Sequence, residues 1–314
     1  MSKPRLNPQE PIASAGRRIM RAQFAKARSF EAAARRAALR PADVETIHDM
    51  RVAVRRMRSL FRLLAPYEAA PAARHTPSLK SVRRPAQALA SRLGQVRDWD
   101  VLIRDLRAHL KRLPAARQLA LKPLLNNWLA RRREAQRALI VFLDGEAYAE
   151  WTARLARFLR APPQKPPAPR LCDEVPALVW RQYAAVRRYE TDIAEAALPV
   201  LHALRIECKR LRYTLEFFAG ALGGGAGPLI ETLVAMQDLL GALHDADVAC
   251  QVVGEFQRSL RRGTVDAACR READLYRRSL RRRIGRLRLS VVERWPSVTA
   301  PSFRRALGEA VAAL

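Results

Sequence analysis

Two stretches of the sequence each carry a histidine followed by a ladder of cations at helical spacing. The first, IHDMRVAVRRMRSLFRLL, runs from Ile47 to Leu64, and the second, LHALRIECKRLRYTLEFF, runs from Leu201 to Phe218. Arginine and lysine donate charge-assisted hydrogen bonds, and the planar arginine fork can hold two oxygens of one phosphate. These residue types therefore indicate chemistry with anions, and with phosphate groups in particular.

The spacing predicts that the cations of each stretch share one helix face. Each residue of an α-helix turns by about 100°, so the first set falls in an arc roughly 80° wide. We call these sets the first and second cationic stripes. Their members are His48, Arg51, Arg55, Arg58 and Arg62, and then His202, Arg205, Lys209 and Arg212.

Apolar residues flank both cationic stripes. The core-side flanks are Met50, Val54, Met57, Phe61 and Leu64, with Leu204, Cys208, Leu211, Leu215 and Phe218 in the second stretch. The opposite flanks are Val52 and Leu63, with Ile206, Tyr213 and Phe217. An ordinary solvated helix face lacks such flanks, so each stripe is predicted to line a cleft between helices.

A row of like charges at this spacing destabilises a helix unless an anion balances it. From His48 to Arg58 the row covers roughly 15 Å at 1.5 Å per residue, which suits a linear chain of phosphates better than one phosphate. Two readings compete with this one. A single arginine-rich face is often plain solvated surface, and the two histidines could instead hydrogen-bond the backbone or pack between the halves.

The stripes belong to an internal repeat. At one offset, Arg51 matches Arg205, Arg55 matches Lys209, and the remaining matched pairs are His48 with His202, Arg56 with Arg210 and Arg58 with Arg212. A second phrase recurs in the same order, LGQVRDWDV at residues 93–101 and LGALHDADV at 240–248. The simplest account is a duplicated helical bundle with a pseudo-two-fold axis and a ligand site at the shared interface.

Composition and pattern predict an all-α protein, since alanine, leucine and arginine dominate and strand-like alternation is absent. The expected helices are Ile12–Leu39, Val44–Ala65, Ser78–Val96, Asp98–Leu113, Ala115–Leu143, Ala147–Leu159, Asp173–Ala197, Val200–Ala219, Pro228–Leu243, Asp245–Arg262 and Thr264–Leu289. The proline-rich run APPQKPPAPR at 161–170 is a stiff connector. It divides the chain into halves 1–160 and 171–314.

The repeated second phrase contains the acidic pairs Asp98/Asp100 and Asp245/Asp247. Each D-x-D resembles a helix start, where aspartate caps free N–H groups; the carboxylates could also orient an arginine, or form a metal or acid–base site. A hydrolase needs a nucleophile with its activator, or convergent metal ligands. No such set is recognisable, so we expect no enzymatic activity, no catalytic residue, no metal and no cofactor.

The charge balance limits the classes of partner. Lys plus Arg total 58 against 30 Asp plus Glu, a net charge of +28, while 49% of residues are apolar. A disordered polycation lacks that many apolar residues, so a folded binder of a polyanion is expected. The four cysteines form no CxxC pair, which suits a reducing cytoplasm. The N-terminal segment has no apolar signal region, and no run is long and apolar enough to span a membrane.

The two repeated phrases together resemble the two halves of a CHAD domain, the conserved histidine α-helical domain, over about Ile12–Leu289. The resemblance implies two antiparallel four-helix bundles with pseudo-two-fold symmetry and a basic groove between them. It also implies inorganic polyphosphate as the ligand, recruitment to polyphosphate granules, and other granule proteins as further candidate partners. In the second stripe Glu216 matches Arg62, so that stripe is expected to be shorter, with Glu216 repelling phosphate or pairing with Arg212.

Later basic helices could add secondary contacts with the ligand. The candidates are Arg18 and Arg21 on the first helix, Arg62 at the end of the first stripe, and Arg131, Arg132, Arg278 and Arg282. The main alternative function is general polyanion, DNA or RNA binding, although only 6% of residues are aromatic, which is few for stacking on single strands. Membrane binding is not expected, because no apolar stripe lies opposite the charges. The sequence leaves open the oligomeric state and the preferred chain length.

Overall fold

The computed structural model describes residues 6–36, 41–68, 77–161, 169–191, 193–260 and 264–314. The side chains of 41–44 and 264–266 are not described. The helices are α1 (Ile12–Ser29), α2 (Glu31–Arg36), α3 (Pro41–Leu64), η1 (Ala65–Tyr67), α4 (Leu79–Leu110), α5 (Ala115–Asp144), α6 (Glu146–Arg160), α7 (Leu171–Arg187), α8 (Leu198–Phe218), α9 (Ala226–Ser259), α10 (Thr264–Arg294), α11 (Pro296–Thr299) and α12 (Pro301–Ala312). The described residues contain no strand beyond one isolated bridge, so the all-α prediction is confirmed.

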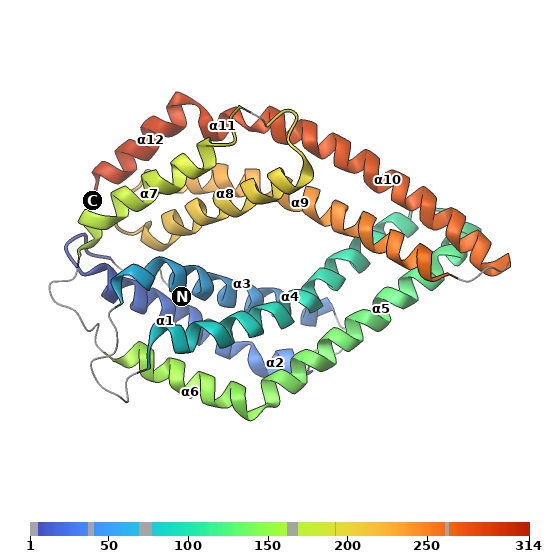
Figure 1. Cartoon of the computed structure of the whole chain (residues 1–314), viewed down its shortest axis with the longest axis horizontal. Coiled ribbons are helices and arrows are strands. Elements are labelled where there is room, and N and C mark those ends of the chain that lie inside the picture. The colour runs from blue at the N-terminus through green and yellow to red at the C-terminus, as the bar shows by residue number, and fades with distance from the viewer. Residues whose placement is uncertain (1–5, 37–40, 69–76, 162–168, 192, 261–263) are drawn as a thin grey trace.

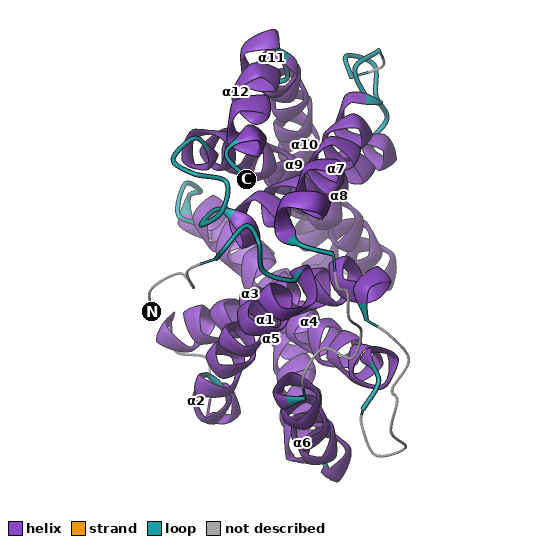
Figure 2. Ribbon diagram, turned by 90° about the vertical axis from the view of Figure 1, so that its left-hand side faces the viewer, coloured by secondary structure: helices purple, strands orange, loops and turns teal. Residues whose placement is uncertain are grey.

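The helices form two layers that meet along a shared interface (Figures 1 and 2). The helices α1 to α6 lie on one side, with α3 packed on α1 and α4, and α4 packed on α5. The helices α7 to α12 lie on the other side, where α8 packs on α7 and α9, and α9 packs on α10. Across the interface α3 contacts α8, α4 contacts α9, and α5 contacts α10. The repeated phrases therefore fall on matching helices of the two layers.

The predicted core-side residues form the interior. All ten core-side flanking residues have an exposed fraction of 0%, which fixes the rotation of α3 and α8 about their axes. One hydrophobic cluster draws residues from both layers, and a smaller one lies where α4, α5, α9 and α10 meet, around Trp128 and Tyr276. The two halves are therefore joined by a common core. No helix in the described part of the chain is long and apolar enough to cross a membrane.

Several predicted helix boundaries were wrong. The helices α4 and α9 each run unbroken through Asp98 and Asp245, because no breaker stands there and packing supports the helix along its whole length. The expected helix Ile12–Leu39 is interrupted at Phe30, where the buried Glu31 accepts a hydrogen bond from the Tyr148 hydroxyl. The helix expected to reach Ala197 ends at Arg187. Most of the predicted linker, and the ends of the first and the Asp245–Arg262 helices, lie outside the described residues.

The helix-start interpretation of the acidic pairs is also wrong, since these aspartates lie within helices. The side chain of Asp100 is instead buried in an ion pair with Arg132, at 2.9 Å, and the two side chains are 4% and 2% exposed. Arg132 also donates a hydrogen bond to Gln136 one turn along α5. This pair joins α4 to α5, so the role of Asp100 is to hold an arginine.

We expect Asp100→Ala to lower the free energy of unfolding by about 3–5 kcal/mol, because it leaves the Arg132 charge buried without its partner. Denaturant unfolding followed by circular dichroism measures this loss. Asp247→Ala is the matched control: Asp247 is half-buried and accepts a hydrogen bond from Gln251 at 3.0 Å, so a loss below about 1 kcal/mol is expected there. Equal losses in the two variants would contradict the assigned role.

Candidate functional site

The helices α3 and α8 place the two cationic stripes at the interface of the layers. Within each stripe the described side chains are half-buried, except Arg62, which is exposed. This intermediate burial follows from the apolar flanks, of which Tyr213 and Phe217 are only 2% and 4% exposed. The stripes are therefore sheltered at the interface of α3 and α8 rather than set on a flat solvated face. We refer to this interface as the groove.

The clearest evidence that the stripes face each other is the environment of Lys209 on α8. The pKa of Lys209 is lowered to about 7, first by burial and then by Arg205, Arg55, Arg51 and Arg58, in that order. Three of these four arginines lie on α3. Because Coulomb repulsion weakens with distance, the cations of α3 must lie close to the Lys209 ammonium across the groove.

The arginines of the groove lie in the same repulsive environment. Burial lowers the pKa of Arg55, and Arg51 and Arg212 lower it further. Burial also lowers the pKa of Arg205. Asp245 raises that pKa, and Arg55 on the facing helix lowers it. In the described part of the chain, five cations of the two stripes have no carboxylate within ion-pair distance: Arg55, Arg58, Arg62, Arg205 and Lys209.

Unsatisfied donors accompany these unpaired charges. The Nε atoms of Arg55, Arg56 and Arg210 are buried and have no hydrogen-bond acceptor among the described residues. A buried donor without an acceptor costs about 1–3 kcal/mol. At the last position of the first stripe, burial lowers the pKa of the Arg62 guanidinium, and Arg210 and Arg58 lower it further. The groove therefore offers a continuous surplus of donors and positive charge.

Glu216 neutralises the cations at one place in this groove. It accepts hydrogen bonds from Arg212 on its own helix at 2.5 Å and from Arg56 on α3 at 2.6 Å. The predicted pairing of Glu216 with Arg212 is thus confirmed, and the contact with Arg56 adds a link between the layers. Arg210 is paired in a similar way with Glu207, at 2.5 Å. These carboxylates shorten the unpaired part of the second stripe.

Two aromatic rings support the arginines around Glu216. The Arg56 guanidinium lies 5.3 Å from the ring centre of Phe217 and 5.8 Å from that of Tyr213. Arg55 and Arg212 lie 5.7 Å and 4.8 Å from the same Tyr213 ring. Cation–π contacts of this kind hold the guanidinium groups in place. Because the two rings are buried beneath arginines, neither presents a free face to solvent.

The repeated second phrase positions the first arginine of each stripe. A Cβ atom added to Gly94 would lie 3.9 Å from Arg51 Nε, and one added to Gly241 would lie 3.8 Å from Arg205 Nε. The small residue leaves room for the arginine stem to lie across the neighbouring helix in both halves. The Asp98 carboxylate then lies 3.8 Å from Arg51. The same arrangement of arginine and glycine recurs because both phrases recur.

The histidines at the start of each stripe also have similar surroundings. His48 and His202 are half-buried, and in each the Nδ1 atom is buried without a hydrogen-bond partner in the described part of the chain. Burial, reinforced by Arg97, lowers the pKa of His48. The ring of His202 lies 4.6 Å from that of His244, beside a cavity of about 260 Å³. Burial, Arg205 and His202 lower the pKa of His244 to about 4, so His244 is neutral near pH 7.

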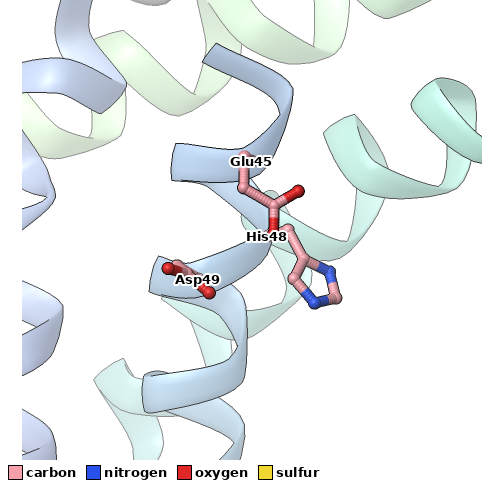
Figure 3. A group of neighbouring side chains, drawn as sticks. All are labelled: Glu45, His48 and Asp49. Atoms are coloured by element: carbon pink, nitrogen blue, oxygen red, sulfur yellow. The ribbon is translucent and has the colours of Figure 1, made fainter. Parts of the chain in front are cut away.

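Two carboxylates on α3 stand near His48 but have no counterpart in the matching places of α8. Glu45, His48 and Asp49 lie close together on α3 (Figure 3), and their ligand atoms are within 4.8 Å of one another. The residues in the matching places of α8 are Pro199 and Ala203. Such a group could ligate a cation, but no other feature of this end of α3 points to one.

The structure places the residues predicted as secondary contacts in different surroundings. Arg132 is buried against Asp100, which removes it from any ligand surface. Arg18 pairs with Glu10, at 2.6 Å, and Arg21 donates to the Leu159 carbonyl. Arg131 and Arg282 are exposed, and Arg278 is exposed and paired with Asp274. Arg62, at the end of the first stripe, lies close enough to Arg210 on α8 for that residue to lower its pKa after burial does.

Three residues near the groove were missed at the sequence level. Gln237 on α9 accepts from Arg212 Nε at 3.1 Å and donates to the Cys208 carbonyl, which fixes the arginine. Burial lowers the pKa values of Arg58, Arg62 and His48. Arg83 on α4 lowers those of Arg58 and Arg62 further, and Arg97 lowers that of His48 further. The one signal in the sequence is that Arg97 stands in the same repeat position as His244. Helical spacing on one element does not reveal cations from a neighbouring element.

Comparisons with known proteins agree with this architecture. The family model described as CHAD domain matches residues 18–254. A structure described as the crystal structure of the CHAD domain from the plant Ricinus communis is 21% identical, covers 100% of this chain and 96% of that chain, and has a TM-score of 0.65. PptA from Streptomyces chartreusis is 14% identical, with 91% and 99% of the two chains covered and a TM-score of 0.67. No curated protein matches the sequence.

Proposed function

Because the chain belongs to the CHAD domain family, we propose that it binds inorganic polyphosphate in the groove between α3 and α8, without catalysing a reaction on it. The observation that carries this proposal is the convergence of Arg51, Arg55 and Arg58 with Arg205 on Lys209, which adds to burial in lowering the pKa of that lysine. A chain of phosphates supplies negative charge and acceptors along a line, which matches a line of unpaired donors.

The proposed binding residues are those of the repeat: His48, Arg51, Arg55, Arg56, Arg58, His202, Arg205, Lys209, Arg210 and Arg212. Among them, Arg55, Arg58, Arg205 and Lys209 are expected to contribute most, because the described chain gives them no carboxylate. Arg56, Arg210 and Arg212 are already paired, so they should contribute less. In this proposal, binding recruits the protein to polyphosphate granules in the cytoplasm.

The burial of the rings and cations at the groove favours polyphosphate over nucleic acid. Proteins that hold single strands stack bases on exposed aromatic rings, whereas Tyr213 and Phe217 are buried beneath arginines. The phosphates of a duplex lie on the outside of a wide rod, while polyphosphate is a thin single chain that can enter between two helices. The half-buried position of Lys209 and Arg55 therefore suits the thinner polymer.

The deciding experiment is calorimetric titration with long-chain polyphosphate over a salt series, repeated with duplex DNA and with RNA as competitors. We expect tight binding that weakens steeply as salt rises, since counterions are released, and little competition from either nucleic acid at equal phosphate concentration. Equal preference for DNA or RNA would leave a general polyanion binder. Absence of polyphosphate binding would remove the proposal altogether.

A further inference from the structure

A second basic cavity lies outside the groove between α3 and α8. It has a volume of about 440 Å³ and lies between the C-terminal half of α4 and the middle of α10. Its lining includes Asp105 and His109 from α4 and Arg112 just beyond the end of that helix. The helix α10 contributes Tyr276, Arg283 and Arg286. None of the ten proposed polyphosphate-binding residues lines it. The volume is in the range of pockets that take small molecules.

The arginines of this cavity carry more charge than their surroundings balance. Arg112 and Arg286 are exposed, and neither has an ion pair within the described part of the chain. Arg283 donates through Nη1 to Asp105 at 3.0 Å, which leaves its other donors available. Asp105 is shared with Arg104, at 2.9 Å. Three guanidinium groups therefore face one shared carboxylate, and an anion with about two charges would balance them.

Two residues of the cavity lining, Tyr276 and His109, are uncharged. Tyr276 is 2% exposed, and its hydroxyl has no hydrogen-bond partner among the described residues. The ring of His109 lies 4.5 Å from the Tyr276 ring. Burial lowers the pKa of His109, helped by Arg117 and Arg112 and opposed by Glu272, so this imidazole is neutral near pH 7. It can exchange a hydrogen bond with a ligand without adding charge.

The polar residues that α4 contributes to the cavity have no counterpart on the matching helix α9. In the register that aligns Leu93 with Leu240, the places of Asp105, His109 and Arg112 are taken on α9 by Val252, Phe256 and Ser259. The repeated fold therefore does not require these polar residues. Their presence in the first half alone separates this cavity from the groove, where both halves contribute matching cations.

We propose that this cavity is a separate binding site for a compact phosphate dianion, either inorganic phosphate or a phosphate monoester, held by Arg112, Arg283 and Arg286. Guanidinium forks from two sides of the cavity can approach different oxygens of one phosphate. Asp105 in the lining of the cavity interrupts the run of positive charge, which disfavours a long polyanion there. The site is independent of the polyphosphate groove.

The test is histidine-selective NMR of the full chain, which has five histidines, with His109→Gln used to assign the His109 signal. Titration with inorganic phosphate should shift that signal saturably, whereas sulfate at equal ionic strength shifts it less. A second titration with adenosine monophosphate distinguishes the two sources. A response to the monoester alone identifies an ester ligand, and a response to phosphate alone identifies the free ion.

The variant Arg112→Ala/Arg286→Ala should weaken the response at least about tenfold, since two charge-assisted contacts are lost. The matched control Arg107→Ala/Arg281→Ala removes the same charge from exposed positions nearby on α4 and α10. It should change the apparent affinity for phosphate, read from the His109 signal, less than about twofold. The groove variant Arg55→Met/Lys209→Met should keep the phosphate response of the His109 signal even if its polyphosphate binding is lost. No saturable shift, an equal loss in the control, or a loss only in the groove variant would overturn the proposal.

Discussion

Replacing Arg55 and Lys209 together by methionine is expected to weaken long-chain polyphosphate binding at least about a hundredfold, because each charge-assisted contact contributes about 1.5–3 kcal/mol. The two residues occupy matching positions of the repeat, one on each side of the groove. Neither has an ion pair to a described carboxylate. Methionine keeps the apolar stem that packs against the helix flanks, so the loss reports on charge and donors.

The same variant is expected to be more stable than the wild type when no ligand is bound. In the wild type without ligand, the charges of Arg55 and Lys209 repel Arg51, Arg58 and Arg205. Removing the two charges relieves this repulsion in the folded state, so the melting temperature should rise by a few degrees. Added polyphosphate should raise the melting temperature of the wild type only. Calorimetric titration and thermal unfolding measure the two effects.

The control for this pair is Arg133→Met/Arg281→Met, which removes the same charge from exposed positions on α5 and α10. We expect its affinity to stay within about threefold of the wild type, because exposed charges act only through a screened field. If the control loses as much affinity as the groove variant, net charge alone explains the binding. Unchanged affinity of the groove variant would place the ligand elsewhere.

Polyphosphate binding at about pH 8.5 is expected to take up nearly one proton, and Lys209 is the group that accepts it. In the free protein this lysine has a pKa of about 7, set first by burial and then by the facing arginines Arg205, Arg55, Arg51 and Arg58. These arginines do not titrate in this range. A phosphate chain in the groove favours the ammonium and returns its pKa toward the ordinary value of 10.5. Affinity should therefore fall by about tenfold per pH unit between about pH 7 and pH 10.

The free energy of unfolding changes with pH in the direction opposite to that expected for a lysine in a favourable ion pair. The native pKa of Lys209 lies below its unfolded value, so between about pH 7 and 10.5 the unfolded chain binds more protons. Stability of the free protein should therefore rise with pH through this window, and the penalty is fully present below about pH 7. Lys209→Arg should abolish both effects, because arginine stays charged.

Calorimetry in two buffers of different ionisation enthalpy measures the proton uptake directly. Wild type at about pH 8.5 should give buffer-dependent enthalpies, and Lys209→Arg should give the same enthalpy in both. His48 and His244 do not confuse the result, since burial lowers their pKa values and they are already neutral in this range. Proton uptake that persists in Lys209→Arg would assign it to another group.

The sequence alone determined the fold class, the core faces and the cationic stripes. Helical periodicity is a local property, so the spacing of Met50, Val54 and Met57 is enough to assign them to the core, and their burial is confirmed. The repeat then predicted that Arg55 and Lys209 would face a shared groove. The structure brings Arg55 close enough to Lys209 to lower the pKa of that lysine. Both copies of the repeated phrase make a similar contact, Arg51 with Gly94 and Arg205 with Gly241.

Tertiary structure decided which charges are free. The sequence offers both Arg55 and Arg132 as contacts for the ligand, yet Arg55 has no ion pair among the described residues and Arg132 is buried against Asp100. Glu216 neutralises Arg56 from the opposite layer, and His109 gains its surroundings from α10. Ion pairs and desolvation depend on residues distant along the chain, so periodicity along one helix places a side chain on a face but leaves its partner undetermined.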